Sequence, residues 1–240
     1  YHKGLIYITS DYEPRGYLVA IETKTGEEKW RTDRNTMASW STPVVGYVAG
    51  KNQLLSSGQL KVTSQDPLTG ILLWEAPHIS KSTCGTVVWN KDSVFASGGF
   101  PKNQTAAYAA DGSGMLLWQN KERTYEQSML VHGNELYTVT DKGFALCWDT
   151  KTGEEHWSQR LGRGGVMASP TYANGLIYAP IKNGQTTVFK ATPKKFEQIA
   201  QNQLGDDTYA SPVFIGDEIY MRVGFRTEGN RRELLYCLGE

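Results

Sequence analysis

Short apolar segments separated by polar turn residues run along the whole chain. Gly4-Leu5-Ile6-Tyr7-Ile8 and Tyr17-Leu18-Val19-Ala20-Ile21 are the first two. Such segments are rich in Val, Ile, Tyr and Trp and are bounded by Gly, Asn, Asp and Ser, which is typical of strands joined by hairpins. No segment has the sustained i, i+3, i+4, i+7 apolar spacing of an amphipathic helix. Even for Lys190–Gln203, the stretch most compatible with a helix, its place in the repeat predicts a strand. We therefore predict an all-β chain.

The pattern repeats with a period of about 40 to 45 residues. A turn followed by a tryptophan four residues after a glycine occurs four times, with spacings of 44, 44 and 39 residues between the tryptophans: Thr25–Trp30, Thr69–Trp74, Ser113–Trp118 and Thr152–Trp157. Phe196, another 39 residues on, stands in a degenerate fifth copy that has no glycine.

Three further elements recur in a constant order, and we label the four strands of one repeat A to D, with D ending at the tryptophan. Strand A carries a proline that directly follows Ser or Thr, as in Ser41–Val45, Ala168–Thr171 and Ala210–Phe214. Strand B resembles Gly-x-Ile-Tyr, as in Gly4–Ile8, Asn134–Thr138, Gly175–Ala179 and Asp217–Met221. Strand C resembles Leu-x-Ala-Leu, as in Tyr17–Ile21, Phe144–Trp148 and Leu234–Leu238.

Four strands per 40 to 45 residues match one blade of a β-propeller. The first blade lacks strand A and the sixth lacks strand D, so we expect 22 strands in about five and a half four-stranded antiparallel blades. We predict one propeller domain over residues 1–240, with blades at 1–33 (partial), 34–77, 78–121, 122–160, 161–203 and 204–240 (partial).

The turn between strands C and D and the tryptophan at the end of D have structural roles in this interpretation. In Asp66–Gly70 and Asp149–Gly153, the aspartate can hydrogen-bond the backbone two residues on and the glycine supplies a positive φ. The large tryptophan rings are expected to pack between neighbouring blades. These blade-docking residues are Trp30, Trp74, Trp118 and Trp157.

Composition removes several classes of function. The chain has 25 Lys plus Arg and 25 Asp plus Glu, so its zero net charge gives no reason to expect nucleic acid as a partner. No apolar run approaches the ~20 residues of a membrane-spanning helix. Cys84, Cys147 and Cys237 are far apart among apolar neighbours, where a thiol packs as a small hydrophobe.

The combination of Gly-x-x-Tyr, Leu-x-Ala, Thr-Gly-x-x-x-Trp and Ser-x-Pro-Val resembles the PQQ-like (quinoprotein-type) β-propeller repeat. Lys29–Thr32 with Ser39–Pro43, and the final Leu235–Glu240, resemble the non-catalytic BamB-like proteins of bacterial cell envelopes. This resemblance implies an eight-bladed ring, of which the chain would be the C-terminal arc. A closed six-bladed ring, with the last blade completed by the first strands, is the alternative.

The same resemblance bears on catalysis. Quinoprotein dehydrogenases hold PQQ with Ca²⁺ through a stacking tryptophan, carboxylate and amide ligands, a catalytic aspartate and adjacent cysteines. None of these can be matched residue by residue here, so we expect no cofactor, no metal site and no catalytic residues. A PQQ- and Ca²⁺-dependent alcohol or sugar dehydrogenase, with part of its site in missing blades, remains the first alternative. An extracytoplasmic sensor domain of a larger protein is the second.

We expect a binding or scaffolding protein of the periplasm or cell envelope that engages a protein or peptide. In a propeller, the D–A and B–C loops emerge on one face, and loops on a rigid scaffold collect binding residues. Exposed aromatic and Arg side chains are common interface anchors. The candidate partner-binding residues are Trp40, Tyr209, Arg34, Tyr125 and Arg163. The long B–C loops are predicted at Ser10–Gly16, Gly98–Thr105 and Val223–Arg232.

Overall fold

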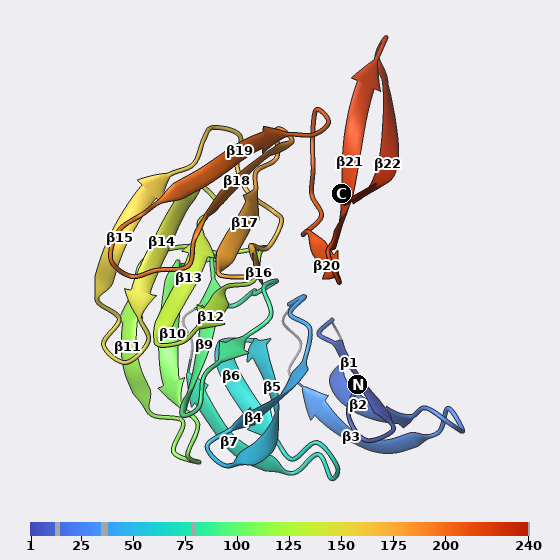
Figure 1. Cartoon of the computed structure of the whole chain (residues 1–240). Coiled ribbons are helices and arrows are strands. Elements are labelled where there is room, and N and C mark those ends of the chain that lie inside the picture. Colours follow the sequence, from blue (N-terminus) through green and yellow to red (C-terminus); the bar gives the residue numbers. More distant parts are fainter. Residues whose placement is uncertain (13–14, 35–37, 78–79, 240) are drawn as a thin grey trace. The chain divides into compact units, whose positions relative to one another are not determined.

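A computed structural model describes residues 1–12, 15–34, 38–77 and 80–239, and within these residues the chain forms 22 strands and no helix (Figure 1). The predicted all-β fold and the predicted number of strands are confirmed. The chain divides into two compact units, which are described separately: unit 1 comprises Tyr1–Tyr125 with Thr150–Gly153, and unit 2 comprises Glu126–Asp149 with Glu154–Glu240. The prediction of one domain over residues 1–240 stays a prediction.

Unit 1 contains three antiparallel sheets. The first has the order β1-β2-β3, formed by Leu5–Ser10, Gly16–Glu22 and Glu28–Arg34. The second has the order β4-β5-β6-β7, formed by Val44–Val48, Lys51–Gly58, Lys61–Gln65 and Leu72–Pro77. The third has the order β8-β9-β10-β11, formed by Val88–Trp89, Ser93–Gly98, Gln104–Ala109 and Leu116–Asn120.

Unit 2 also contains three antiparallel sheets. The first has the order β12-β13-β14-β15, formed by Leu130–His132, Glu135–Val139, Phe144–Asp149 and Glu155–Arg160. The second has the order β16-β17-β18-β19, formed by Thr171–Ala173, Leu176–Pro180, Gln185–Lys190 and Gln198–Gln203. The third has the order β20-β21-β22, formed by Val213–Ile215, Glu218–Thr227 and Asn230–Leu238.

The first and last sheets are three-stranded in the way that the repeat predicts. β1, β2 and β3 correspond to strands B, C and D, so β1 is an edge strand of its sheet. The last sheet contains β20, β21 and β22, which correspond to strands A, B and C. Here strand C, β22, is an edge strand of its sheet. Each sheet therefore contributes one blade or partial blade.

Strand A begins later than the sequence indicates, because the segment that ends in proline precedes it. β4 starts after Pro43, and β20 starts after Pro212. The residues before the strand instead hydrogen-bond the equivalent segment of the next repeat: Ser41 Oγ donates to Gly85 O (3.1 Å), and the Ser169 amide donates to Ser211 Oγ (2.8 Å). Proline has no amide hydrogen to give to a sheet, which fits this position just outside the strand.

The predicted B–C loop at Val223–Arg232 is wrong, because this segment is mostly strand. β21 and β22 pair without interruption from Ile219↔Leu238 to Thr227↔Asn230. The turn consists of Glu228 (φ 52°) and Gly229 (φ 80°), the two positive φ angles that a tight two-residue hairpin requires. A sequence reading that looks for Asn-Gly or Asp-Gly misses a Glu-Gly turn.

The C–D turns form as predicted. Asp66 Oδ1 accepts hydrogen bonds from the amides of Leu68 and Thr69, both at 2.9 Å. Gly70 and Gly153 have φ of 74°. The turn thus fixes the start of strand D by side-chain capping and a left-handed glycine.

Three of the four blade-end tryptophans pack against the C–D turn of the following repeat. Trp30 Nε1 donates to Pro67 O (3.0 Å), Trp118 Nε1 to Thr150 O (2.9 Å) and Trp157 Nε1 to Thr192 O (2.8 Å). A β-carbon at Gly153 would lie 2.6 Å from Trp118 Cδ2. The tryptophan of one repeat therefore docks on the C–D turn of the next, with both its ring and its donor used.

Trp74 differs, because a buried glutamine stands between its ring and the backbone. Its Nε1 donates to Gln53 Oε1 (2.7 Å), and Gln53 Nε2 donates onward to Ala110 O (2.8 Å). Ser64 Oγ also donates to Gln53 Oε1 (2.6 Å). Gln53 is fully buried, so this amide satisfies polar groups that the core would otherwise leave unpaired.

Five C–D pairs contain a β-bulge at one common position. On strand D the extra residue directly precedes the one that faces strand C, as when Ala20 pairs with Trp30 and Ile21 with Glu28. The same register shift occurs in the pairings of β6 with β7, β10 with β11, β14 with β15 and β18 with β19. In β19 the aligned residue is Ala200, which pairs with Val188.

The expectation that Phe196 continues the tryptophan series is therefore wrong. Phe196 precedes β19 and meets Trp157 edge-on, with ring centroids 5.5 Å apart. It belongs to the turn region on which Trp157 docks. The 39-residue spacing is a coincidence of a longer turn in this repeat.

Candidate protein-interaction site

Trp40 and Tyr209 occupy the same position of the repeat, three residues before Pro43 and Pro212. They lie in different units, Trp40 in unit 1 and Tyr209 in unit 2, and both are solvent-exposed, by 62% and 41%. The Trp40 amide donates to Thr83 O at 2.8 Å. Its backbone is thus held while its ring remains in water.

A groove of about 440 Å³ lies beside Trp40 within unit 1. One wall is the edge strand β1 and the residues after it, 7–12, and the other is residues 39–43. Tyr12 at one end is 72% exposed. The groove therefore offers aromatic rings above a floor of small hydroxyl side chains such as Ser39 and Ser41.

Arg34 does not lie on an exposed loop, where the sequence analysis placed it. It is the last residue of β3, and its guanidinium binds the Asp11 carboxylate through Nε (2.7 Å) and Nη2 (3.1 Å). The side chains of Arg34 and Asp11 are only 7% and 1% exposed. Gln59 Nε2 adds a third hydrogen bond to Asp11 (2.9 Å). Arg34 binds Asp11, which lines the groove, and is not available to a partner.

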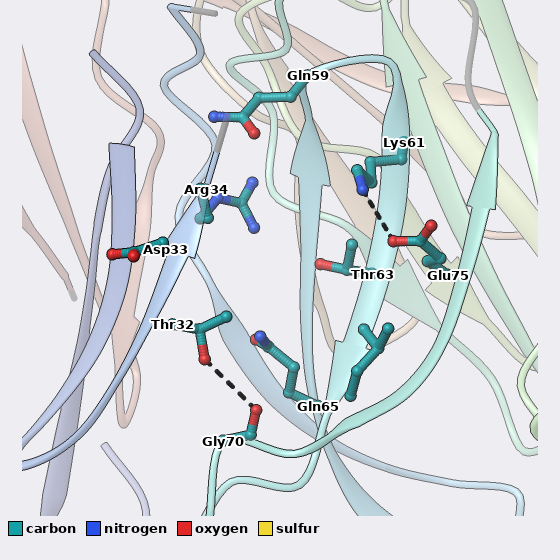
Figure 2. Close-up of a pocket in the computed structure, with 10 residues that line it drawn as sticks. Thr32, Asp33, Arg34, Gln59, Lys61, Thr63, Gln65, Gly70 and Glu75 are labelled. Atoms are coloured by element: carbon teal, nitrogen blue, oxygen red, sulfur yellow. Dashed lines mark hydrogen bonds and ion pairs between the residues drawn. The ribbon is translucent and has the colours of Figure 1, made fainter. Parts of the chain in front are cut away.

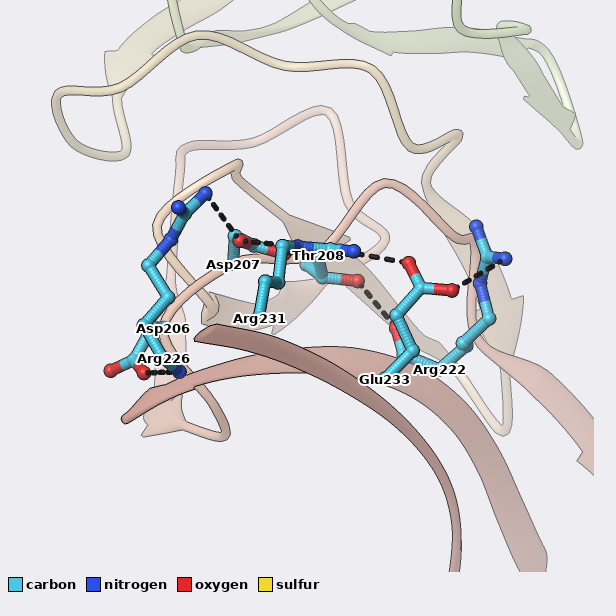
Figure 3. Close-up of polar contacts among 7 residues, drawn as sticks. All are labelled: Asp206, Asp207, Thr208, Arg222, Arg226, Arg231 and Glu233. Atoms are coloured by element: carbon cyan, nitrogen blue, oxygen red, sulfur yellow. Dashed lines mark hydrogen bonds and ion pairs between the residues drawn. The ribbon is translucent and has the colours of Figure 1, made fainter. Parts of the chain in front are cut away.

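Tyr209 lies among charged side chains of unit 2. Lys182 Nζ is 5.3 Å from the centre of the ring and Arg231 Cζ is 5.8 Å from it, both within the range of cation–π attraction. Arg231 also binds the buried Asp207, with Nη2 2.7 Å from Oδ1 (Figure 3). The Arg231 hydrogen bonds hold the pKa of Asp207 below its ordinary value.

The network around Asp207 continues along the β21–β22 hairpin. Arg226 Nη2 binds Asp207 Oδ2 (3.1 Å), and Glu233 accepts from Arg231 (2.8 Å) and Arg222 (3.1 Å). Arg231 is thus an ion-paired residue. The network ties the residues before strand A of this repeat to strands B and C.

The other two candidates lie in separate units. Tyr125 in unit 1 is half-buried, with Arg123 Cζ 5.0 Å from its ring centre. Arg163 in unit 2 is exposed, and its carbonyl accepts a hydrogen bond from Asn183 Nδ2 (3.4 Å). Unit 1 therefore contains Trp40 and Tyr125, and unit 2 contains Tyr209 and Arg163.

Cys84, Cys147 and Cys237 are free thiols, and burial raises the pKa of Cys147 to about 12. Within the described ranges, no group of three His, Cys, Asp or Glu side chains is placed to hold a metal ion. The same residues include no helix long and apolar enough to cross a membrane.

A family model described as outer membrane protein assembly factor BamB matches residues 2–143 and 101–195. The chain belongs to this family of PQQ-like repeat proteins. Among curated proteins, none matches the sequence significantly.

Three solved structures show the same kind of fold. BamB from Moraxella catarrhalis is 12% identical, with a TM-score of 0.52 over 92% of this chain and 80% of that chain. The quinohemoprotein alcohol dehydrogenase from Comamonas testosteroni is 13% identical, with a TM-score of 0.66 over 93% of this chain and 50% of that chain. A chain of a mitotic checkpoint complex is 10% identical, with a TM-score of 0.70 over 99% of this chain and 72% of that chain. At these identities the likeness concerns the fold, which is a quinoprotein-like β-propeller.

For this BamB-family chain, the sequence did not predict that Asp11 and Asp207 are buried and bind arginines. Asp11 follows β1, a strand B, and Asp207 precedes β20, a strand A. Each is more than nine-tenths buried. The one available signal was an aspartate in an otherwise exposed loop with an arginine about 23 residues later, as in Asp11 and Arg34 or Asp207 and Arg231. That spacing becomes meaningful only when the register of strands B, C and D is known.

Proposed function

We propose that this chain is a non-enzymatic binding or scaffolding β-propeller of the bacterial cell envelope, which engages a protein or peptide through its D–A and B–C loop face. Membership of a family described as an outer membrane protein assembly factor supports the location and the class. The observation that carries the binding role is the exposed aromatic ring at one repeat position in two blades, Trp40 and Tyr209.

Trp40 has the properties of an interface anchor. Contact with a partner would remove a large apolar area of its exposed indole from water. Tryptophan is also enriched among residues that dominate binding energy. The hydrogen bond from its amide to Thr83 O fixes the segment before binding, which lowers the entropy cost of association. The adjacent groove gives room for a partner side chain.

Tyr209 suggests what kind of partner segment suits unit 2. Lys182 and Arg231 lie over its ring, and Arg226, which shares Asp207 with Arg231, has a side chain that is 61% exposed. A partner that combines an apolar group with a carboxylate would match an aromatic ring flanked by cations. We therefore favour an acidic rather than a basic contact at this ring.

The test replaces each ring and measures partner capture. A photo-crosslinking residue at position 40 or 209 should give a discrete crosslinked product in envelope extracts, and Trp40→Ala with Tyr209→Ala should remove most of the capture by the intact protein. Tyr47, 66% exposed on β4, provides the matched control as Tyr47→Ala. Capture that is unchanged in the double variant, or equally reduced by Tyr47→Ala, would contradict the site.

A PQQ-dependent oxidoreductase is the second candidate function. It is favoured by the fold likeness to a quinohemoprotein alcohol dehydrogenase, of which the chain spans half the length. Incubation of the intact protein with PQQ and Ca²⁺, followed by alcohol- or sugar-dependent reduction of an artificial electron acceptor, tests it. Dye reduction above the rate without protein would support this candidate, and its absence would count against it.

A further inference from the structure

Unit 1 contains a polar pocket between β3 and the strands β6 and β7. Its volume is about 270 Å³, and we call it the Gln65 pocket. Figure 2 shows the Gln65 amide, the Thr63 hydroxyl and the Arg34 guanidinium pointing into one space, while Asp33 points away from it. Packed interiors rarely leave a space of this size, and those that are lined by polar groups contain solvent or a ligand.

The pocket exists because the chain departs from its own repeat at position 65. Gln65 is the residue of strand C just past the bulge, and the same position is occupied by Tyr108, Trp148 and Phe189 in the other sheets with a complete C–D pair after blade 1. Those three rings are at most 2% exposed. Phe189, for example, packs edge-on against Trp157 at 5.9 Å. Where three other repeats have a buried aromatic ring, this repeat has an amide.

The side-chain amide of Gln65 lacks a hydrogen-bond partner for its oxygen. Gln65 is 3% exposed, and its Oε1 has no hydrogen-bond partner. A buried acceptor without a partner is unfavourable, because it has lost its hydrogen bonds to water. The chain therefore carries an unfavourable group at the inner side of the pocket that a bound donor would relieve.

The charged groups that point into the pocket are already paired. Arg34 uses Nε and Nη2 on Asp11 and Nη1 on Ser56 Oγ (3.2 Å). Lys61 Nζ binds Glu75 Oε2 at 2.8 Å, with both side chains partly exposed at the pocket's edge. An anion would have to compete with these carboxylates for the cations.

The unpaired Gln65 Oε1 defines the chemistry of the ligand. The unmet group is a neutral acceptor, so the ligand must donate a hydrogen bond. An ammonium group would be buried beside a neutral amide with no free carboxylate pointing at it, which is costly. A hydroxyl group can donate to Gln65 Oε1 and accept from a neighbouring hydroxyl such as that of Thr63. The exposed Leu72 adds an apolar patch for carbon-bound hydrogens.

We propose that the Gln65 pocket binds a small, uncharged polyhydroxyl compound, with one ligand hydroxyl donating to Gln65 Oε1. Its volume lies just below the usual range for drug-sized ligands, which suits a molecule of monosaccharide size or smaller. The residues that line this pocket differ from those that line the groove beside Trp40, and the proposal does not depend on the proposed function.

The test is titration of the intact protein with D-glucose, myo-inositol and glycerol, followed by NMR through the side-chain amide signals of Gln65. At least one of these probes should shift the Gln65 signals saturably. Acetate and methylammonium, added at the same concentration, should leave them unchanged. If no polyhydroxyl probe binds, or if only a charged probe does, the proposal is overturned and the pocket holds water.

Two variants and a control, measured by isothermal titration calorimetry with the probe that shifts the Gln65 signals, locate the binding. Gln65→Phe restores the aromatic residue of the other repeats, fills the pocket and should weaken binding by at least about tenfold. Should Gln65→Phe not fold, Thr32→Val removes a half-buried pocket hydroxyl on β3 with little effect on packing and should also weaken binding. The control, Gln201→Phe, places the same Gln-to-Phe change at an exposed position of β19, and this variant should bind like the wild type. Equal binding by the wild type and both pocket variants would overturn the proposal.

Discussion

Gly70 lies directly against the indole ring of Trp30: a β-carbon on Gly70 would come within 2.6 Å of Trp30 Cε3. The glycine is in the left-handed region, at φ 74°, so it serves the turn and the docked ring at once. In the Thr-Gly-x-x-x-Trp repeat, the glycine of one copy thus receives the tryptophan of the copy before it. The sequence spacing reports contact between successive repeats as well as the geometry within one.

Gly26 and Gly70 provide a matched pair that separates backbone strain from this contact. Gly26 has nearly the same φ, 75°, but nothing lies within 4 Å of the β-carbon that alanine would add. Gly26→Ala should cost about 1–2 kcal/mol from the left-handed conformation. Gly70→Ala should cost at least about 1–3 kcal/mol more, since Trp30 must move. Urea unfolding of both variants measures the difference, and equal midpoints would contradict the docking role.

Gln53 should be among the residues whose replacement destabilises the protein most. Gln53→Leu would leave Trp74 Nε1, the Ser64 hydroxyl and the Ala110 carbonyl without their partner. Each buried unpaired group costs about 1–3 kcal/mol, so a loss above about 3 kcal/mol in the free energy of unfolding is expected. Gln201→Leu on the exposed face of β19 is the control and should change stability little. A near-neutral Gln53→Leu would show that these groups find other partners.

Asp207 should make stability depend on pH in the acidic range. Its folded-state pKa is lowered by Arg231, so its contribution is present above the unfolded pKa and is lost as the pH falls through the folded pKa. Asp207→Asn should lower the free energy of unfolding by about 2 kcal/mol at pH 7, and the difference from wild type should shrink towards pH 3. Urea titrations across this range test it, with the exposed Asp217→Asn as the control. A difference that stays constant with pH would argue against ionised Asp207 as the cause.

The three cysteines should react with thiol reagents at very different rates. Cys237 is exposed, whereas Cys147 is fully buried with its pKa raised to about 12 by burial, so little thiolate is present at pH 8. Labelling of the native protein followed by mass spectrometry should find Cys237 modified first and Cys147 protected. In urea the two should react alike. Fast labelling of native Cys147 would contradict its buried position.

The sequence was sufficient for the fold because every repeat carries several independent signals. The tryptophan, the Asp-to-Gly turn and the Gly-x-Ile-Tyr strand all recur, so an error in one copy is corrected by the others. The predicted 22 strands and the partial first and last sheets follow from this redundancy. The start of strand A was wrong because Ser-x-Pro bonds to the neighbouring repeat, a contact that no single repeat reveals.

The candidate site was harder to predict because it depends on where side chains point. Trp40 and Tyr209 are exposed as a loop position suggests, but Arg34 is buried on Asp11. The difference comes from a non-local ion pair whose members are 23 residues apart in sequence. Gln65 illustrates the same limit: its polar character is visible in the sequence, but its buried position and the volume beside it follow only from packing.

The bulges on the outer strands have a consequence for how the protein keeps apart from other molecules. β3, β7, β11, β15 and β19 are edges of their sheets, and each carries an extra residue that breaks the regular row of backbone groups. An interrupted edge is a poor template for pairing with a foreign strand. β22 pairs with β21 in unbroken register and has Leu235 71% exposed. Intermolecular strand pairing should therefore occur at β22 more readily than at the bulged edges, and Leu235→Lys should slow it.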